Sequence, residues 1–290
     1  MANYVFSGHD KFHCRQYWLK KGYDFVKSGK WFSDNDAVVE LGVGKNMVGA
    51  IYHWMRAFGL ITSDRELTEL SDFLLDEENG ADPYLENIAS IWLLHYHLIA
   101  SNYASLYHII FNEIKGDRVT FNEDHIFKKI ESHLKTSPKN FSIQTIINDI
   151  DVFRRNYIRP TKVSQVEDDL SSILIDLHII DEIPVSKMES RKYKIENANR
   201  PAIPKELILY GILNQLRDNQ LISFEEIANG ELGVGRIFAL TPNSLVDKIK
   251  ELEHETGEIV YASDGGIQTI SLQDVSLRDK KLEVLQPIYR

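Results

Sequence analysis

The sequence is poor in cysteine and in long apolar runs. Cys14 is the single cysteine among 290 residues, which excludes an internal disulfide framework and any metal site built from several thiolates. The longest apolar stretch, residues 88–99, is interrupted by polar side chains and falls short of the about 20 residues that a membrane-spanning helix needs. The first residues lack the basic and apolar regions of a secretory signal. We therefore expect a cytoplasmic protein with no membrane partner.

Basic residues are also in short supply. The chain has 33 lysines and arginines against 43 aspartates and glutamates, which gives a formal net charge of −10. This balance argues against a general polyanion binder. The deficit is uneven, because residues 1–60 hold eight basic and five acidic side chains, whereas the remainder is strongly acidic. If the protein contacts nucleic acid, the sequence places that contact in the first fifth of the chain.

The hydrophobic periodicity and the turn signals predict a mainly α protein with small β wings, an α+β fold in three parts. Residues 1–80 are predicted to form a winged helix-turn-helix, with helices at 15–28, 35–41 and 45–58 and a hairpin at 60–62 and 66–68. Residues 81–200 are predicted as a mostly helical central domain. Its expected elements are a long helix at 84–114, shorter helices at 124–134, 142–151 and 168–177, and a hairpin at 179–185 and 192–195.

Residues 201–290 repeat the opening theme and are predicted as a winged-helix-like domain. Helices are expected at 205–217 and 224–228, and Thr241 with Pro242 begins a third helix that Gly257 ends. Two strands, 258–263 and 267–272, flank a glycine-rich turn. The third helix carries two lysines among four acidic side chains, so it would repel DNA. We expect it to contact protein, with a homodimer as one possibility.

The predicted helix at 45–58 has an apolar arc and a polar arc. Packing of the apolar arc on the two preceding helices leaves an exposed set: Lys45, Asn46, Gly49, Tyr52, His53 and Arg56. Donors at the N-terminal end of such a helix reach base edges and phosphates in the major groove of double-stranded DNA. The alternatives are an ordinary amphipathic helix with a solvated face and a winged helix that contacts only protein.

The densest polar cluster lies in residues 7–15. Its candidate catalytic residues are His9, Asp10, Lys11 and His13. An imidazole can act as a base or as a nucleophile toward phosphorus, and a lysine can stabilise phosphate charge. The alternative is phosphate anchoring or local structure. A DNA nickase built here could use a divalent metal ion, whose ligands the sequence does not identify.

Other basic side chains are candidate DNA contacts. Arg15, Lys20 and Lys21 belong to the positive N-terminal segment, and Arg154, Arg155 and Arg159 form a second basic patch before the acidic run at 167–169. For this patch, a solvated surface or ion pairing with the acidic run is the alternative. Residues 42–46 lack the first glycine and the hydroxyl residue of a phosphate-binding loop, so we expect no nucleoside triphosphate site.

Several short motifs resemble the bacterial DUF4007 family. They include FSGHDKF at 6–12, LGVGKNMV at 41–48, AFGLI at 57–61 and DPYLE at 82–86, and weaker likeness continues beyond residue 150. The chain departs from the family pattern at Asp10, where a glutamate is expected after Gly-His, and at Ser71, where a glycine is usual. The first change keeps the charge but shortens its reach.

This resemblance implies a protein of bacterial DNA phosphorothioation and anti-phage loci, acting beside a cysteine desulfurase and a PAPS-reductase-like ATPase. It implies that the protein binds and nicks DNA so that sulfur can replace a non-bridging phosphate oxygen. Three hypotheses remain open from the sequence. They are a DNA-nicking enzyme, a non-catalytic DNA-binding adaptor and a transcriptional regulator of the same locus.

Overall fold

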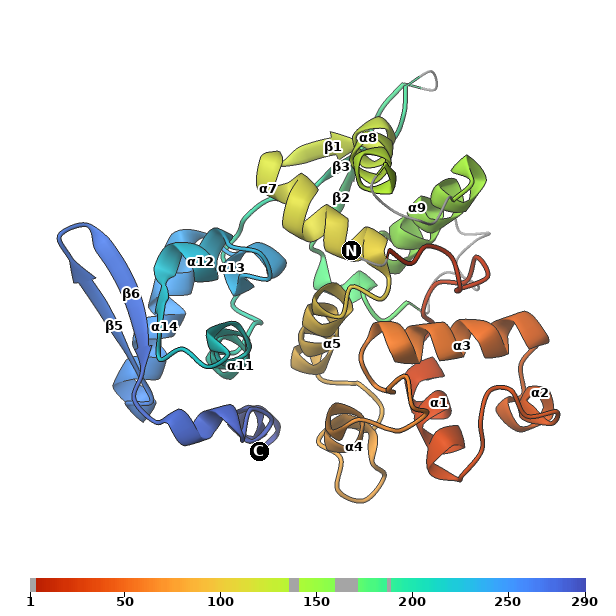
Figure 1. Ribbon diagram of the computed structural model, residues 1–290, viewed down its shortest axis with the longest axis horizontal. Coiled ribbons are helices and arrows are strands. Elements are labelled where there is room, and N and C mark those ends of the chain that lie inside the picture. The colour runs from red at the N-terminus through yellow and green to blue at the C-terminus, as the bar shows by residue number, and fades with distance from the viewer. Residues whose placement is uncertain (1–3, 136–140, 160–171, 187–188) are drawn as a thin grey trace. The chain divides into compact units, whose positions relative to one another are not determined.

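The computed structural model describes residues 4–135, 141–159, 172–186 and 189–290. The chain divides into two compact units, one of residues 1–110 and 120–194 and one of residues 111–119 and 195–290 (Figure 1). Helices dominate both units, and the described residues contain two three-stranded sheets. The predicted combination of many helices with small β elements is therefore confirmed. The division into three domains stays a prediction.

Three helices open the first unit: α1 (Trp18–Lys27), α2 (Ala37–Leu41) and α3 (Lys45–Ala57). Gly42 ends α2 in the left-handed conformation, with φ of 60°. The predicted apolar arc of α3 is buried, with Ile51 and Trp54 fully inaccessible. Helix α1 approaches this arc closely at Gly22, where a β-carbon would lie 2.9 Å from Ile51 Cγ2. The three helices therefore share one core, which fixes the outward face of α3.

The hairpin predicted after α3 is reduced to one isolated bridge between Ile61 and Leu67. The two segments still pair on either side of this bridge, since the Thr62 N–H donates to the Glu66 carbonyl at 2.8 Å and the Thr68 N–H to the Leu60 carbonyl at 3.1 Å. Thr62 also shapes the turn between them. Its hydroxyl accepts hydrogen bonds from the backbone N–H groups of Asp64 and Glu66, both at 3.2 Å, and so closes a tight turn locally. Helix α4 (Glu69–Leu75) follows directly, because the Thr68 hydroxyl caps its first turn.

The single long helix predicted at 84–114 is wrong. Helix α5 (Ile88–Ala100) ends before an irregular segment in which Asn102 is left-handed, with φ of 50°. The Ser101 hydroxyl donates to the Ala57 carbonyl at 2.8 Å and ties this segment to the end of α3. Helix α6 (Ser105–His108), a π-helical stretch (Ile109–Ile114) and α7 (Lys115–Asp117) continue the chain. Apolar composition alone concealed the break.

The rest of the first unit combines two helices and a sheet. Helices α8 (Glu123–Leu134) and α9 (Ile143–Tyr157) match two predicted helices, although α9 is longer than expected. Strands β2 (Asp181–Ile183) and β3 (Lys192–Lys194) form the predicted hairpin, and β1 (Thr120–Asn122) adds an unexpected third strand to β3. Of the helix predicted at 168–177, residues 168–171 lie outside the described chain, and a 3₁₀ turn covers Ile175–Leu177.

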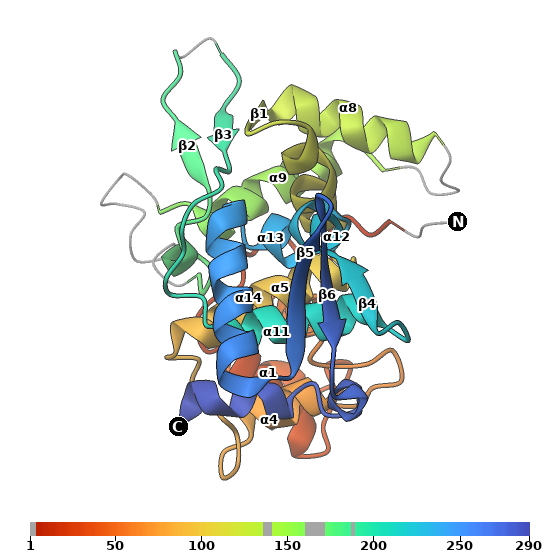
Figure 2. The ribbon, with the colours of Figure 1, turned by 90° about the vertical axis from the view of Figure 1, so that its left-hand side faces the viewer.

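The second unit contains its predicted helices and hairpin in the predicted order. Its elements are α11 (Lys205–Leu216), β4 (Leu221–Ser223), α12 (Phe224–Asn229), α13 (Val234–Ile237), α14 (Pro242–Thr256), β5 (Ile259–Asp264) and β6 (Ile267–Leu272). Of these, β4 and α13 are unpredicted additions. The sheet order is β4-β6-β5, and the long β5–β6 hairpin lies beside α14 (Figure 2). The predicted signals act as expected, since Thr241 caps α14 and left-handed Gly257 ends it. Two 3₁₀ segments, Val275–Arg278 and Glu283–Tyr289, close the chain.

In the part of the chain that is described, every helix is too short or too polar to span a bilayer.

Candidate functional site

The segment before α1 contains an unusual backbone loop at residues 7–11. Ser7, Gly8, Asp10 and Lys11 all have positive φ angles, of 68°, 97°, 45° and 66°. Three of these residues have side chains that rarely adopt this conformation, so the loop stores strain that its surroundings must hold. Strain of this kind clusters at ligand clamps and active sites. The loop is therefore the first candidate for a functional site.

Asp149 on α9 binds this loop through its carboxylate. Its side chain is buried, with 6% of the residue exposed. Its two oxygens accept the Ser7 N–H at 2.9 and 3.0 Å, and Oδ1 lies 3.1 Å from His9 Nε2. The buried carboxylate thus binds both the backbone and the imidazole of one short loop.

The hydrogen bonds of His9 settle which ring nitrogen carries the proton. The Lys11 N–H donates to His9 Nδ1 at 3.2 Å, so Nδ1 acts as an acceptor. The proton of the neutral ring therefore lies on Nε2 and points at Asp149. Because both nitrogens are used and only 3% of His9 is exposed, its ring has no lone pair directed at solvent. This geometry suits a residue that positions the loop better than a general base.

Helix α3 packs against the same loop from the other side. The His9 ring is stacked on Trp54 with a centroid distance of 6.0 Å, and it meets His53 edge-to-face at 5.3 Å. The Trp54 indole N–H donates to the Phe12 carbonyl at 3.1 Å. The predicted catalytic cluster and the predicted recognition helix are therefore neighbours within one unit.

Helix α9 also anchors the residues that follow the loop. Arg155 donates to the Lys11 carbonyl, and the Cys14 N–H donates to Asn156 Oδ1 at 3.0 Å. Burial raises the pKa of the Cys14 thiol well above its usual value. His13 is buried as well, so this predicted catalytic residue faces the interior. Arg15, a predicted DNA contact, lies against an aromatic side chain, with its guanidinium 5.5 Å from the Trp18 ring centroid.

The exposed groups of the site are few and lie close to the N-terminal end of α3. Asp10 and Lys11 of the loop are exposed, as are Lys45 and Asn46 of α3. The Asp10 carboxylate lies over Gly49, where a β-carbon would be 3.5 Å from its Oδ2 atom. A carboxylate, two ammonium groups and an amide are therefore presented to solvent by the loop and the first turns of α3.

The C-terminal half of the predicted polar arc is covered, and the prediction that His53 is exposed is wrong. Only 2% of His53 is exposed, because the loop and Tyr103 lie over it. Burial, with the nearby His9, lowers the pKa of His53 to about 3, so its imidazole is neutral. Arg56 is partly covered, with its guanidinium 5.2 Å from the Tyr103 ring centroid. Tyr52 packs against Phe32 at 5.5 Å.

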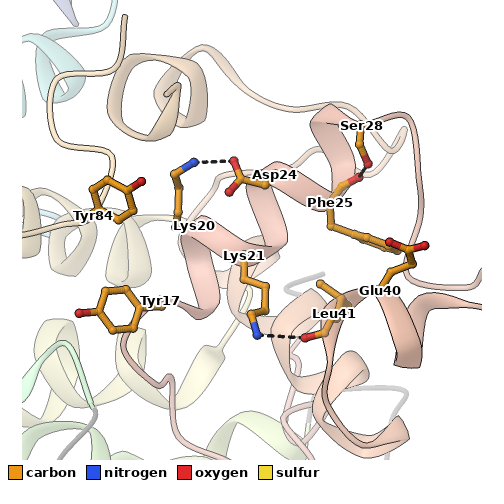
Figure 3. A pocket seen from close by; sticks show the side chains of 9 residues that line it. All are labelled: Tyr17, Lys20, Lys21, Asp24, Phe25, Ser28, Glu40, Leu41 and Tyr84. Carbon is orange, nitrogen blue, oxygen red and sulfur yellow. Dashed lines mark hydrogen bonds and ion pairs between the residues drawn. The ribbon is translucent and has the colours of Figure 1, made fainter. Parts of the chain in front are cut away.

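Lys20 and Lys21, predicted as DNA contacts, are engaged with protein groups in the structure. They line a cavity of about 460 Å³ beside α1 and α2 (Figure 3). Lys20 Nζ lies 2.6 Å from Asp24 and 2.8 Å from Glu77. Lys21 Nζ donates to the Leu41 carbonyl at the end of α2, at 3.0 Å. Two carboxylates therefore balance the charge of Lys20, and its contact with DNA stays a prediction.

The second basic patch is partly paired within the protein. Arg154 and Arg155 pair with Asp151 at 3.3 and 3.1 Å, and Arg159 pairs with Asp176 at 3.3 Å. The acidic run at 167–169, the predicted ion-pair partner, lies outside the described residues. Ion pairing is therefore what the described part of this patch shows, with acidic partners that the sequence did not identify.

The sequence leaves the ligands of a divalent metal ion open. Within the described ranges, no group of three or more His, Cys, Asp and Glu side chains is arranged to hold a metal ion. Both oxygens of Asp149 are already bound to the loop.

Asp149 is the site residue that sequence reasoning missed. It lies 140 positions from His9, inside an ordinary amphipathic helix. One signal could have revealed Asp149. Its carboxylate falls on the buried face of the predicted helix, at a position where an apolar side chain is expected.

Comparison with known proteins places this chain in a family. Residues 6–289 match the family described as "Protein of unknown function (DUF4007)". Two solved structures titled "SspB crystal structure" and "Magnesium ion-bound SspB crystal structure" resemble it with TM-scores of 0.86 and 0.85. Each is 27% identical to this chain in sequence, and each alignment covers 99% of this chain and 88% of the solved chain. A search of curated proteins gave no match. Because the family match spans nearly the whole chain, the protein belongs to the DUF4007 family.

Proposed function

We propose that this protein binds double-stranded DNA and nicks one strand, as a component of a bacterial DNA phosphorothioation and anti-phage system. The system is suggested by the motif resemblance and by the likeness to SspB structures. The observation that carries the DNA contact is the position of the strained loop at 7–11 beside the exposed N-terminal turns of α3. The cysteine desulfurase and the ATPase of such systems are the proposed protein partners.

The N-terminus of α3 has the properties of a phosphate-binding element. Gly44 caps this helix without any side-chain hydrogen bond, and the first turn contains no acidic residue. Its N–H groups and the positive end of the helix dipole therefore face outward together with Lys45 and Asn46. We interpret α1, α2 and α3 with the turn after α3 as a winged helix-turn-helix, in which α3 lies in the major groove.

The exposed Asp10 and Lys11 would then carry the chemistry, with His9 positioning them. In phosphodiester hydrolysis a water oxygen forms a new bond to phosphorus and gives up a proton, one P–O bond to a sugar breaks, and the departing sugar oxygen takes up a proton. In this proposal the Asp10 carboxylate orients the attacking water, and the Lys11 ammonium offsets the charge that develops on the phosphate.

A supercoiled plasmid tests this function directly. The wild-type protein is expected to convert it to open circles, whereas Asp10→Asn is expected to retain duplex affinity, measured by fluorescence anisotropy, and to lose nicking. Binding without nicking by the wild type would leave the non-catalytic adaptor. Protection of one operator in a footprint at physiological salt would instead identify the transcriptional regulator.

The second unit supports a protein contact. We interpret its α11–β4–α12–α14–β5–β6 order as winged-helix-like, but α14 exposes Asp247, Glu251 and Glu255, which disfavour DNA. A homodimer or a protein partner is the proposed use of this unit. Sedimentation equilibrium of the full chain distinguishes the two, since only a homodimer doubles the mass in the absence of other proteins.

A further inference from the structure

His53 is a polar residue whose burial the proposed chemistry does not explain. Its Nε2 atom is buried and has no hydrogen-bond partner within the described part of the chain. The ring is enclosed by His9, Trp54 and Tyr103, with centroid distances of 5.3, 5.1 and 5.4 Å. An unpaired nitrogen in this position costs stability that an apolar side chain would not cost. A specific use of the imidazole is therefore expected.

The contact between His53 and Gly8 suggests that use. A β-carbon at Gly8 would lie 2.7 Å from His53 Nδ1, so no side chain fits at residue 8 while the imidazole is in place. Gly8 also has φ of 97°, a conformation that glycine adopts without strain. The His53 imidazole thus fills the space beside residue 8, and the loop backbone turns in direct contact with it.

Two rigid contacts define where the loop lies. Asp149 binds Ser7 and His9 on one side, and His53 contacts Gly8 and His9 on the other. Between them the chain is forced through the left-handed residues that bring the Asp10 carboxylate over Gly49. Removal of either contact would free the loop to relax its strain.

We propose that His53 is a positioning residue that holds the 7–11 loop in its strained conformation and thereby places Asp10 and Lys11 at the DNA-facing end of α3. The role of Asp10 and Lys11 rests on the proposed function, but the position of the loop does not. The proposal concerns the shape of the His53 side chain next to Gly8. Its readouts can therefore be measured without DNA.

A matched pair of variants separates positioning from general packing. His53→Ala removes the imidazole, whereas His53→Asn keeps a polar atom near the position of Nδ1 and loses the rest of the ring. Amide hydrogen exchange followed by mass spectrometry reports the loop, because the Lys11 N–H donates to His9 Nδ1 and the Phe12 N–H donates to the His9 carbonyl. The amides of α5 are the internal control. We expect faster exchange at residues 7–12 in His53→Ala and a return toward the wild-type rate in His53→Asn, with α5 unchanged.

A double-mutant cycle provides the second readout. Gly8→Ala in the wild-type background suffers both an unfavourable φ and the overlap with His53, whereas in the His53→Ala background only the φ cost remains. In each background, Gly8→Ala lowers the folding equilibrium constant by some factor. We expect this factor to be at least about ten-fold smaller in the His53→Ala background than in the wild-type background. Equal costs in both backgrounds, or unchanged loop exchange in folded His53→Ala, would overturn the proposal.

The DNA assays then connect position to function. If the wild type nicks plasmid, His53→Ala is expected to lose roughly 100-fold in nicking rate, as misplaced catalytic groups do, and His53→Asn to recover most of it. Full nicking by a folded His53→Ala variant would also refute the positioning role. If the wild type neither binds nor nicks DNA, the proposed function fails, while the loop exchange and the cycle still decide whether His53 positions the loop.

Discussion

Acidification should destabilise the protein through His53 in a predictable way. Burial, with a contribution from the nearby His9, lowers the pKa of His53 to about 3, from an ordinary value of 6.5 in the unfolded chain. The folded state therefore keeps this ring neutral, whereas the unfolded state takes up a proton below pH 6.5. Stability that is fully present above pH 6.5 is lost as the pH falls toward 3.

The size of the effect follows from these two values. With an unfolded pKa of 6.5 and a folded value of about 3, the loss at pH 5 is about 2 kcal/mol in the free energy of unfolding. The slope between pH 6 and pH 4 averages about 1.2 kcal/mol per pH unit, just below the value for one whole proton. Carboxylates add a slope of their own only near the acidic end of this range.

Urea unfolding of the wild type and of His53→Asn at pH 7 and pH 5 isolates this contribution. The variant lacks the titrating group, so the difference in unfolding free energy between the two proteins should change by about 2 kcal/mol in favour of the variant on going to pH 5. Whatever packing the variant loses appears equally at both pH values. A difference that is the same at pH 7 and pH 5 would show that His53 is not buried as a neutral ring.

Three further outcomes follow from the site. Lys45→Glu combined with Asn46→Asp should weaken duplex binding at least ten-fold at moderate salt and lower the salt dependence, whereas Lys128→Glu on α8 should change little in the same anisotropy titration. Asp149→Ala should cost roughly 3 kcal/mol in urea unfolding, because it leaves the buried donors of the loop unpaired; a loss below 1 kcal/mol would contradict that account. Gly49→Ala should raise the unfolding free energy by about 0.5–1 kcal/mol, because alanine favours the helix more than glycine does. It should also reduce DNA affinity, because the added methyl group crowds Asp10. A gain in both stability and DNA affinity would argue against DNA contact at this position.

Local signals were sufficient for most elements. The caps at Thr241 and Gly257 predicted α14, and the periodicity of apolar residues predicted α3 and its buried arc. These features depend on residues a few positions apart. The break after α5 was not predictable in this way, because it depends on a hydrogen bond from Ser101 to the carbonyl of Ala57.

The candidate site was predictable only in part. The polar cluster and the exposed end of α3 were visible in the sequence, but their proximity depends on packing between distant segments. A helical wheel assigns His53 to the polar arc and contains no information that a loop 40 residues earlier covers it. The role of Asp149 was hidden for the same reason, since its partners are 140 or more positions away.

Hydrogen–deuterium exchange with and without a short DNA duplex tests the central claim most directly. If DNA meets the loop and the first turns of α3, duplex should slow amide exchange at residues 7–11 and 45–49 while the second unit exchanges as before. Protection confined to residues 195–290, or unchanged exchange throughout at saturating duplex, would contradict it.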